Sequence, residues 1–245
     1  MTITLLPGER LDDLQCYGLK LIQRPDAFRF GTDSVLLADF AAPRKNERAV
    51  DLGCGTGAIA FLMAGHQKTM TVEAVELQPD IADMARRSAQ INALEDRVRV
   101  HRMDMREAWR ELGASRYSLA VCNPPYGRSG AALESQSETV RIARHEGDLT
   151  PADVAHSAAM LLKNGGRFCA VFPAPRAYEL MRAMDDNGIA PKRIRTVHGV
   201  AGRAPKFVLV EGVKQGGEGL HWLTPLVLRN EDGSFTEEWH RIYGF

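Results

Sequence analysis

The strongest chemical signal in the chain comes from Asn123, Pro124, Pro125 and Tyr126, which follow a short apolar run. Consecutive prolines cannot donate the hydrogen bonds of a sheet, so they end a strand and hold the backbone extended. The Asn123 amide oxygen and the Pro124 carbonyl can then accept hydrogen bonds from an NH₂ group, while Tyr126 can stack on a planar group. These residues therefore predict a catalytic site for the exocyclic amine of a planar acceptor.

A planar amine is a weak nucleophile because its lone pair is delocalised. Two acceptors that draw on its hydrogens favour a pyramidal nitrogen aimed at an electrophile, so the site needs no strong base. Proximity and in-line orientation supply the rest, about 7 to 11 kcal/mol of barrier reduction. The alternative is that the prolines only close a buried strand, and a complete glycine-rich turn earlier in the chain argues against it.

That turn contains Gly53, Gly55 and Gly57 and follows an apolar run through Asp51. Glycines let the backbone approach a ligand, and the N-terminus of the next helix offers unpaired N–H groups. A dinucleotide site prefers the spacing GxGxxG. The tighter spacing here, with an aspartate before the first glycine, resembles the first motif of class I methyltransferases that use S-adenosylmethionine (SAM) and release S-adenosylhomocysteine.

Further carboxylates stand at the ends of the next predicted strands. Glu76, followed by Leu77, comes about 20 residues after the glycine turn, where a carboxylate can accept both ribose hydroxyls. Asp104 or its neighbour Met105 can face the adenine amine and ring. Each acid alone could equally be a strand-end cap or a solvated side chain, but the ends of successive parallel strands converge on one crevice. With the glycine turn they predict a SAM site, formed by Asp51, Gly53, Gly55, Gly57, Glu76, Leu77, Asp104, Met105 and Asn123.

An alternation of apolar β-type runs and amphipathic helical stretches begins near residue 48 and must position these residues. Strands are expected at 49–53, 71–77, 98–104, 118–122 and 167–172, and helices at 57–65, 79–92, 151–162 and 175–187. The segments 193–198 and 206–213 are too close for a parallel crossover, so they should form an antiparallel pair at one sheet edge. The expected fold is α/β and Rossmann-like, with a seven-stranded, mostly parallel sheet and an antiparallel edge strand.

Residues 1–47 have a different pattern and are expected to form a small cap on the methyltransferase domain, residues 48–245. The cap should contain a hairpin at 16–23, a turn at 24–26 and a helix at 33–40. The four cysteines lie far apart, which indicates neither a disulfide framework nor a metal site. Without a signal peptide or an apolar run of membrane-spanning length, we expect a cytoplasmic protein, with a monomer as the simplest assembly.

The motif NPPY resembles that of amino-methyltransferases acting on adenine N6, cytosine N4 or protein glutamine amides. Release-factor glutamine methyltransferases usually carry a helical substrate domain before the glycine motif, and only 50 residues precede Asp51 here, which argues against a protein amide. The segment FRFGTDSVLLADF (28–40), with DLGCGTG, NPPY, LLKNGGRF and residues 191–193, resembles the bacterial tRNA1(Val) adenine N6-methyltransferase family over nearly the whole chain.

This resemblance implies that the acceptor is the adenosine just beyond the anticodon. It also implies that Thr32 and Asp33 lie at the mouth of the cofactor site, and that Phe28 or Phe30 contacts SAM or the base. An equally open interpretation makes Thr32 or Asp33 a helix N-cap and the phenylalanines core residues.

The 31 basic residues balance the 31 acidic ones, so an RNA site must be a local basic patch. The irregular segment 127–150 is expected to order on substrate binding. Phosphate contacts are expected from two basic sets, one being Arg128, Arg141 and Arg144 and the other Lys192, Arg193, Arg195, Arg203 and Lys206. A single-stranded adenine in an anticodon loop costs less to extrude than one in a duplex.

We therefore expect an enzyme that transfers a methyl group from SAM to N6 of a tRNA adenine, without a metal or a membrane. Alternatives are a methyltransferase with the same motif that acts on guanine N2 of rRNA or on a protein glutamine. A SAM-binding RNA assembly factor without catalysis is the non-enzyme alternative.

Overall fold

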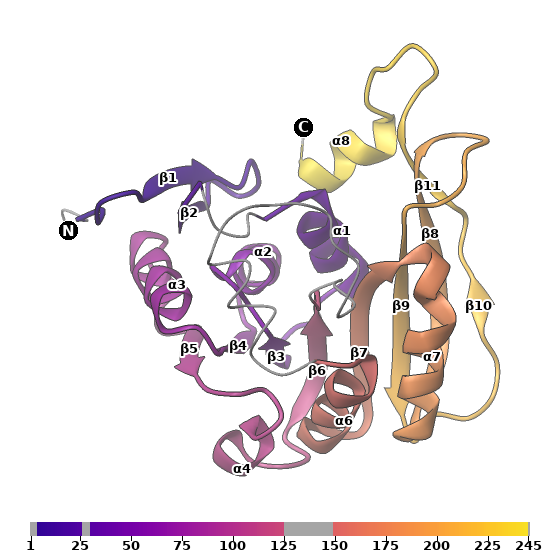
Figure 1. Ribbon diagram of the computed structural model, residues 1–245, viewed down its shortest axis with the longest axis horizontal. Coiled ribbons are helices and arrows are strands. Elements are labelled where there is room, and N and C mark those ends of the chain that lie inside the picture. The colour runs from indigo at the N-terminus through magenta and orange to yellow at the C-terminus, as the bar shows by residue number, and fades with distance from the viewer. Residues whose placement is uncertain (1–3, 26–29, 125–148, 245) are drawn as a thin grey trace.

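The computed structural model describes residues 4–25, 30–124 and 149–244. Its centre is a nine-stranded sheet in the order β10-β8-β9-β7-β6-β3-β4-β5, with β11 paired to β8 (Figure 1). The strands are β3 (Arg48–Leu52), β4 (Thr71–Glu76), β5 (Val98–Arg102), β6 (Tyr117–Cys122), β7 (Leu162–Pro173), β8 (Ile189–Val200), β9 (Phe207–Lys214), β10 (His221–Trp222) and β11 (Leu226–Arg229). The run β5-β4-β3-β6-β7 is parallel, and β9 is antiparallel to both β7 and β8.

The mostly parallel sheet and the antiparallel pair of β8 and β9 confirm the expected strand pattern. The sheet has two more strands than the seven expected, β10 and β11, both parallel to β8. They contain 2 and 4 residues, too few for an alternating pattern to be recognisable.

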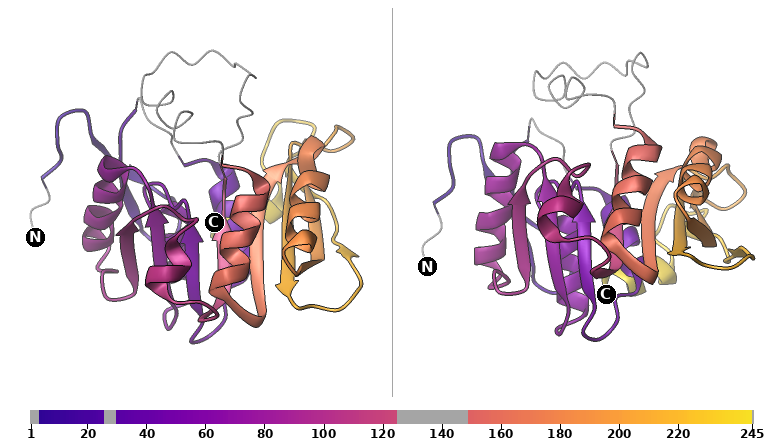
Figure 2. Two further views of the ribbon diagram at one scale, coloured as in Figure 1. Left: turned by 60° about the horizontal axis from the view of Figure 1, so that its bottom comes forward. Right: turned by 90° about the horizontal axis from the view of Figure 1, so that it is seen from below.

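Helices lie on both faces of the sheet (Figure 2). They are α1 (Thr32–Ala41), α2 (Ala58–His66), α3 (Pro79–Ile91), α4 (Ala108–Leu112), α6 (Pro151–Leu161), α7 (Ala177–Asp186) after the 3₁₀ turn Ala174–Arg176, and α8 (Glu237–Tyr243). Along β3, Ala49 joins the buried cluster that includes α1, α2 and α8, while Val50 joins the cluster that includes α4, α6 and α7. Because successive side chains of a strand point to opposite faces, β3 contributes to the hydrophobic layers on both sides of the sheet.

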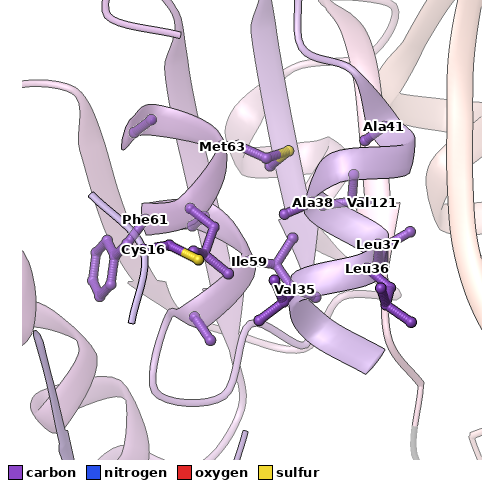
Figure 3. Packing of buried hydrophobic residues seen from close by; sticks show 14 of the residues in the cluster. Cys16, Val35, Leu36, Leu37, Ala38, Ala41, Ile59, Phe61, Met63 and Val121 are labelled. Carbon is purple, nitrogen blue, oxygen red and sulfur yellow. The ribbon is translucent and has the colours of Figure 1, made fainter. Parts of the chain in front are cut away.

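Helix α1 packs beside α2, with Val35 and Ile59 between them (Figure 3). Nearly every residue of α2 is buried, because it packs on β4 and β5 of the sheet and has α1 beside it. This packing fixes where α1 begins, and α1 contributes to the candidate site below.

The N-terminal hairpin differs in its bounds from the expected one. Strands β1 (Arg10–Asp13) and β2 (Lys20–Gln23) pair antiparallel, so the hairpin turn lies between residues 13 and 20 and the expected hairpin bounds of 16–23 are wrong. The turn expected at 24–26 extends beyond the described residues. The hairpin turn uses positive φ at Gln15, Tyr17 and Gly18, and the first two residue types gave no turn signal. The hairpin is fastened to α3, where Ser88 Oγ accepts from the Ile22 N–H at 2.8 Å.

No described helix is long and apolar enough to cross a membrane. In the same parts of the chain, no three His, Cys, Asp or Glu side chains are grouped so as to hold a metal ion. All four cysteines are buried free thiols. The division at residues 47 and 48 stays a prediction.

Candidate active site

The glycine turn connects β3 to α2 in a backbone shape that only glycine adopts readily. Gly53, Gly55 and Gly57 have φ values of 72°, 56° and 96°. The turn is tied to the end of β4, because the Gly53 and Cys54 N–H groups both donate to the Val75 carbonyl at 2.9 Å. A Cβ on Gly57 would lie 2.6 Å from the Phe61 ring, whereas one on Gly55 would meet no atom of the described chain within 4 Å. The Gly55 side of the turn is therefore open to a ligand.

Glu76 meets this turn from the end of β4. Its carboxylate accepts hydrogen bonds from the Gly55 N–H at 3.0 Å and from the Gln78 N–H at 2.9 Å. The side chain is almost fully buried, and Leu77 beside it is 38% exposed. The structure thus brings together the carboxylate and the glycine turn that the sequence placed about 20 residues apart, though it does not test their contacts with a cofactor.

Asp51 lies in β3, two residues before Gly53, and is fully buried. Within the described residues, neither of its carboxylate oxygens has a hydrogen-bond partner. Burial raises the pKa of Asp51 to about 7, the nearby Ala60 N–H opposes the rise, and the charge of Glu76 adds to it. A buried acid without a partner is costly unless it faces a cation. The site thus fits SAM, which carries a sulfonium and an ammonium group.

Asp104 and Met105 follow β5, and the two side chains have different surroundings. The Asp104 carboxylate binds Arg106, with 2.9 Å between Arg106 Nε and Asp104 Oδ2. These hydrogen bonds lower the pKa of Asp104, partly against the effect of burial. Met105 lies next to the turn, since its methyl group is 3.1 Å from where a Cβ of Gly53 would be. Of the two predicted adenine contacts, Met105 is the one in contact with the glycine turn.

Asn123 follows β6, and the pairing of Asp51 with Val121 places it at the level of Gly53, which follows the neighbouring strand β3. Its Nδ2 donates to Asp33 Oδ2 at 3.0 Å, across 90 residues of sequence. Pro124 beside it is buried. Pro125 and Tyr126 lie outside the described residues, so their roles stay predictions.

Helix α1 begins at Thr32, with Gly31 as its N-cap and without a side-chain cap. The interpretation of Thr32 or Asp33 as the N-cap is therefore wrong, and Asp33 stands in the first turn. The backbone N–H of Phe30 donates to Gln23 Oε1 at 3.1 Å, while Phe28 lies outside the described residues. The places of Thr32 and Asp33 at the mouth of the cofactor site, and a contact of Phe30 with SAM or the base, stay predictions.

The C-terminal helix α8 supports this end of α1 and was not expected. Tyr243 of α8 forms a hydrogen bond with Thr32 at the start of α1. Burial raises the pKa of Tyr243, and this bond lowers it by less. Tyr243 stacks on Trp239 with 4.1 Å between ring centroids, and Trp239 stacks on Phe235 at 3.8 Å. Thr236 caps α8 and is followed by two glutamates, a start signal from which the helix could have been predicted.

The predicted RNA-binding cations fall into three groups. Arg128, Arg141 and Arg144 lie outside the described residues. Three more cations bind groups within the chain. Lys192 donates to the carbonyls of residues 217–219. Arg193 binds Glu211 and the Phe40 carbonyl, and Arg195 binds Glu238 and the Thr224 carbonyl. Arg203 and Lys206 are exposed in the turn between β8 and β9.

That turn lies at the same edge of the sheet as Asn123. Both β7 and β8 are antiparallel to β9, so β8 runs in the direction of β6 and β7 and ends where they end. No ion pair of the described part includes Arg203 or Lys206. The predicted RNA contacts of the second set therefore now rest mainly on these two residues.

Residues 26–186 match the family model described as the methyltransferase small domain. The chain belongs to the methyltransferase small domain family. A relative from Tolumonas auensis is 32% identical over 187 residues, 75% of this chain and 76% of its own. One from Yersinia pseudotuberculosis is 28% identical over 217 residues, 88% of this chain and 84% of its own. Both are named tRNA1(Val) (adenine(37)-N6)-methyltransferase, which confirms the resemblance inferred from the sequence.

Solved structures share the fold at lower identity. A protein from Agrobacterium tumefaciens, described as a predicted O-methyltransferase, has a TM-score of 0.71 at 22% identity over 87% of this chain and 96% of its own. The Thermus thermophilus 16S rRNA N2 G1207 methyltransferase, in complex with AdoMet and guanosine, has a TM-score of 0.61 at 19% identity over 86% of this chain and 52% of its own. They confirm a Rossmann-like class I fold, and the family and the fold are those of SAM-dependent methyltransferases.

We expect Gly55→Ala to weaken SAM binding without unfolding the protein. The added methyl group meets no described atom, so apart from backbone strain at positive φ, which the control below shares, its expected effect is a collision with the cofactor. An overpacking cost of about 1 to 3 kcal/mol corresponds to about a 5- to 100-fold rise in the Kd for SAM, measurable by calorimetry. Gly18→Ala is the matched control, because Gly18 also has positive φ and open space but lies in the β1–β2 turn. Equal SAM affinity in both variants would show that the ligand does not reach Gly55.

Proposed function

We propose that this enzyme transfers the methyl group of SAM to N6 of an adenine in tRNA, namely adenosine 37 of tRNA1(Val), the acceptor in the names of its relatives. The observation that carries the proposal is the Asn123 amide at the end of β6, held by Asp33 at the level of the glycine turn. An amide and a proline carbonyl suit an NH₂ group better than a hydroxyl, because they can accept from both hydrogens.

In the proposed reaction, Gly55, Glu76 and Asp51 hold the cofactor, which when bound supplies an electrophilic methyl group. Asn123 and Pro124 accept the hydrogens of the adenine amine and keep its lone pair directed at the methyl carbon. The chain's contribution is orientation together with exclusion of water, and no described residue has to act as a strong base. After transfer the methylated nitrogen is cationic and acidic, so it would release its proton to water.

The test is methyl transfer from labelled SAM to purified tRNA1(Val) lacking the modification, followed by mass spectrometry of the nucleosides. N6-methyladenosine at position 37, the site in the relatives' names, is the expected product. Ribosomal RNA and release factors serve as parallel acceptors. Label in guanine of rRNA or in a glutamine, with none in tRNA, would move the substrate to the corresponding alternative. Binding of SAM and RNA without any transfer would favour an assembly factor.

We further propose that tRNA lies across the β8–β9 turn, and that the enzyme works as a monomer in the cytoplasm, where tRNA is found. Arg203→Ala combined with Lys206→Ala should weaken tRNA binding and lower the salt dependence of log Kd by about 1 for each residue. SAM affinity should be unchanged. Lys68→Ala combined with Lys163→Ala is the matched control, because both lysines are exposed near the starts of β4 and β7, at the opposite edge. An unchanged salt slope in the first variant would place the phosphates elsewhere.

A further inference from the structure

We propose that Asp33 is a positioning residue, which sets the orientation of the Asn123 amide so that its oxygen faces the acceptor amine. The inference deepens the proposed function and rests on it for the identity of the acceptor. The observation is the 3.0 Å hydrogen bond from Asn123 Nδ2 to Asp33 Oδ2.

An asparagine amide has two orientations of nearly the same shape, which exchange an acceptor oxygen for an NH₂ group. An ionised carboxylate can only accept hydrogen bonds, so the atom of Asn123 that faces Asp33 must be the nitrogen. This directs Oδ1 away from Asp33. The reversed orientation would bring the oxygen against a carboxylate and the NH₂ group against the amine of the substrate, where donors would meet donors.

Asp33 itself is held firmly enough to impose this choice. Its Oδ1 accepts from the Ser34 N–H at 2.9 Å. Gly31 leaves room for that oxygen, since a Cβ there would lie 2.8 Å from it. The carboxylate also stands in the first turn of α1, where the helix dipole favours negative charge.

Both ends of α1 are fastened to the rest of the protein. Tyr243 of α8 hydrogen-bonds Thr32 at the beginning. At the other end, the carbonyls of Phe40 and Ala41 accept from Arg193 at 3.2 Å and from Arg167 at 2.7 Å. Between them Leu36 and other apolar residues of α1 are buried. The helix is therefore a fixed support from which Asp33 reaches the end of β6.

Loss of Asp33 should reduce catalysis more than binding. A hydrogen bond to a charged group corresponds to about a 10- to 100-fold change in an equilibrium or a rate. We expect Asp33→Ala to lower kcat by about that factor, with the Kd for SAM and the Tm close to those of the parent enzyme. Asp33→Asn keeps an acceptor oxygen and should recover part of the rate. Asp39→Ala, which replaces an exposed aspartate of the same helix, is the matched control.

An exchanged pair gives a sharper test. Asn123→Asp alone places two carboxylates in contact and should be nearly inactive. Adding Asp33→Asn restores a donor and an acceptor. The amide at position 33 would then donate to the carboxylate at position 123, whose other oxygen would still face the acceptor amine. The substitution of Asp33 should therefore lower activity in the parent and raise it in the Asn123→Asp background. Such a reversal of sign is not expected of a residue that only supports the fold or binds SAM.

Two measurements separate this inference from the proposed function. Methyl transfer by the parent enzyme tests the function. The NMR signals of the Asn123 side-chain amide, identified by their loss in Asn123→Ala, test the hydrogen bond whatever the substrate is. Asp33→Ala should shift them strongly, and Asp39→Ala should not. Unchanged amide signals, or a weakened SAM affinity with unchanged kcat in Asp33→Ala, would overturn the positioning role.

Discussion

Asn123→Ala is expected to lower kcat for methyl transfer about 100- to 1,000-fold, the range seen when a single oriented catalytic hydrogen-bonding group is removed. The variant loses the acceptor that is set by Asp33, while Gly55, Glu76 and Asp51 remain in place. The affinity for SAM should therefore change little. The measurement is single-turnover methyl transfer at saturating SAM and tRNA, beside a calorimetric titration with SAM.

The matched control for this variant is Asn187→Ala. Asn187 ends α7, and its amide donates to the Ala183 carbonyl at 2.8 Å, away from the glycine turn. Full activity in that variant would show that loss of an asparagine amide is harmless elsewhere in the fold. If Asn123→Ala retained the parent's kcat, the acceptor amine would have to be held by other groups, and the proposed mechanism would be wrong.

The core of the site could be predicted from the sequence because its signals are local. The glycine turn and Asn123 each follow a strand, and strand periodicity with proline and glycine chemistry is enough to place them at one edge of a parallel sheet. The contact between Asp33 and Asn123 could not be predicted from spacing, since 90 residues separate them. Only the family resemblance indicated that Asp33 lies near the site.

For the predicted RNA-binding cations of β8, the local sequence pattern was misleading. Lys192, Arg193 and Arg195 form a basic stretch in β8 that is typical of a phosphate-binding surface. In the structure, Arg193 and Arg195 instead bind Glu211 and Glu238. Their partners come from β9 and α8, and nothing in the local pattern shows which cations will be paired. Exposure distinguished Arg203 and Lys206 only once the fold was known.

The burial of Arg167 could not be predicted from the sequence, because a cation at the start of the predicted strand 167–172 would ordinarily be exposed. It is 4% exposed, and its guanidinium lies 3.1 Å from Glu47 and 3.0 Å from Glu211. It also donates to the Ala41 carbonyl at the end of α1. One buried cation thus connects β7, β9, the start of β3 and the helix that carries Asp33.

Arg167→Met is expected to lower the free energy of unfolding by about 3 to 5 kcal/mol, because it leaves the buried Glu47 carboxylate without its cation and removes one of the two cations on Glu211. Glu211 keeps Arg193, while the Glu47 carboxylate loses the guanidinium that binds both of its oxygens. The measurement is urea unfolding at neutral pH. Arg182→Met is the control, because its pair with Asp186 on α7 is largely exposed and should contribute little.

The pH dependence of this loss provides an independent check. Burial raises the pKa of Glu211, but the hydrogen bonds and charges of Arg193 and Arg167 outweigh it and hold the pKa below its ordinary value. A lowered carboxyl pKa stabilises the fold above the unfolded-state pKa of about 4.3, and that stability disappears as the pH falls through the folded-state pKa. The difference between the parent and Arg167→Met should therefore be largest near neutral pH and shrink in acid, where a protonated Glu211 no longer gains from the charge of Arg167. A difference that stayed constant with pH would mean that Arg167 stabilises the core by packing rather than by charge.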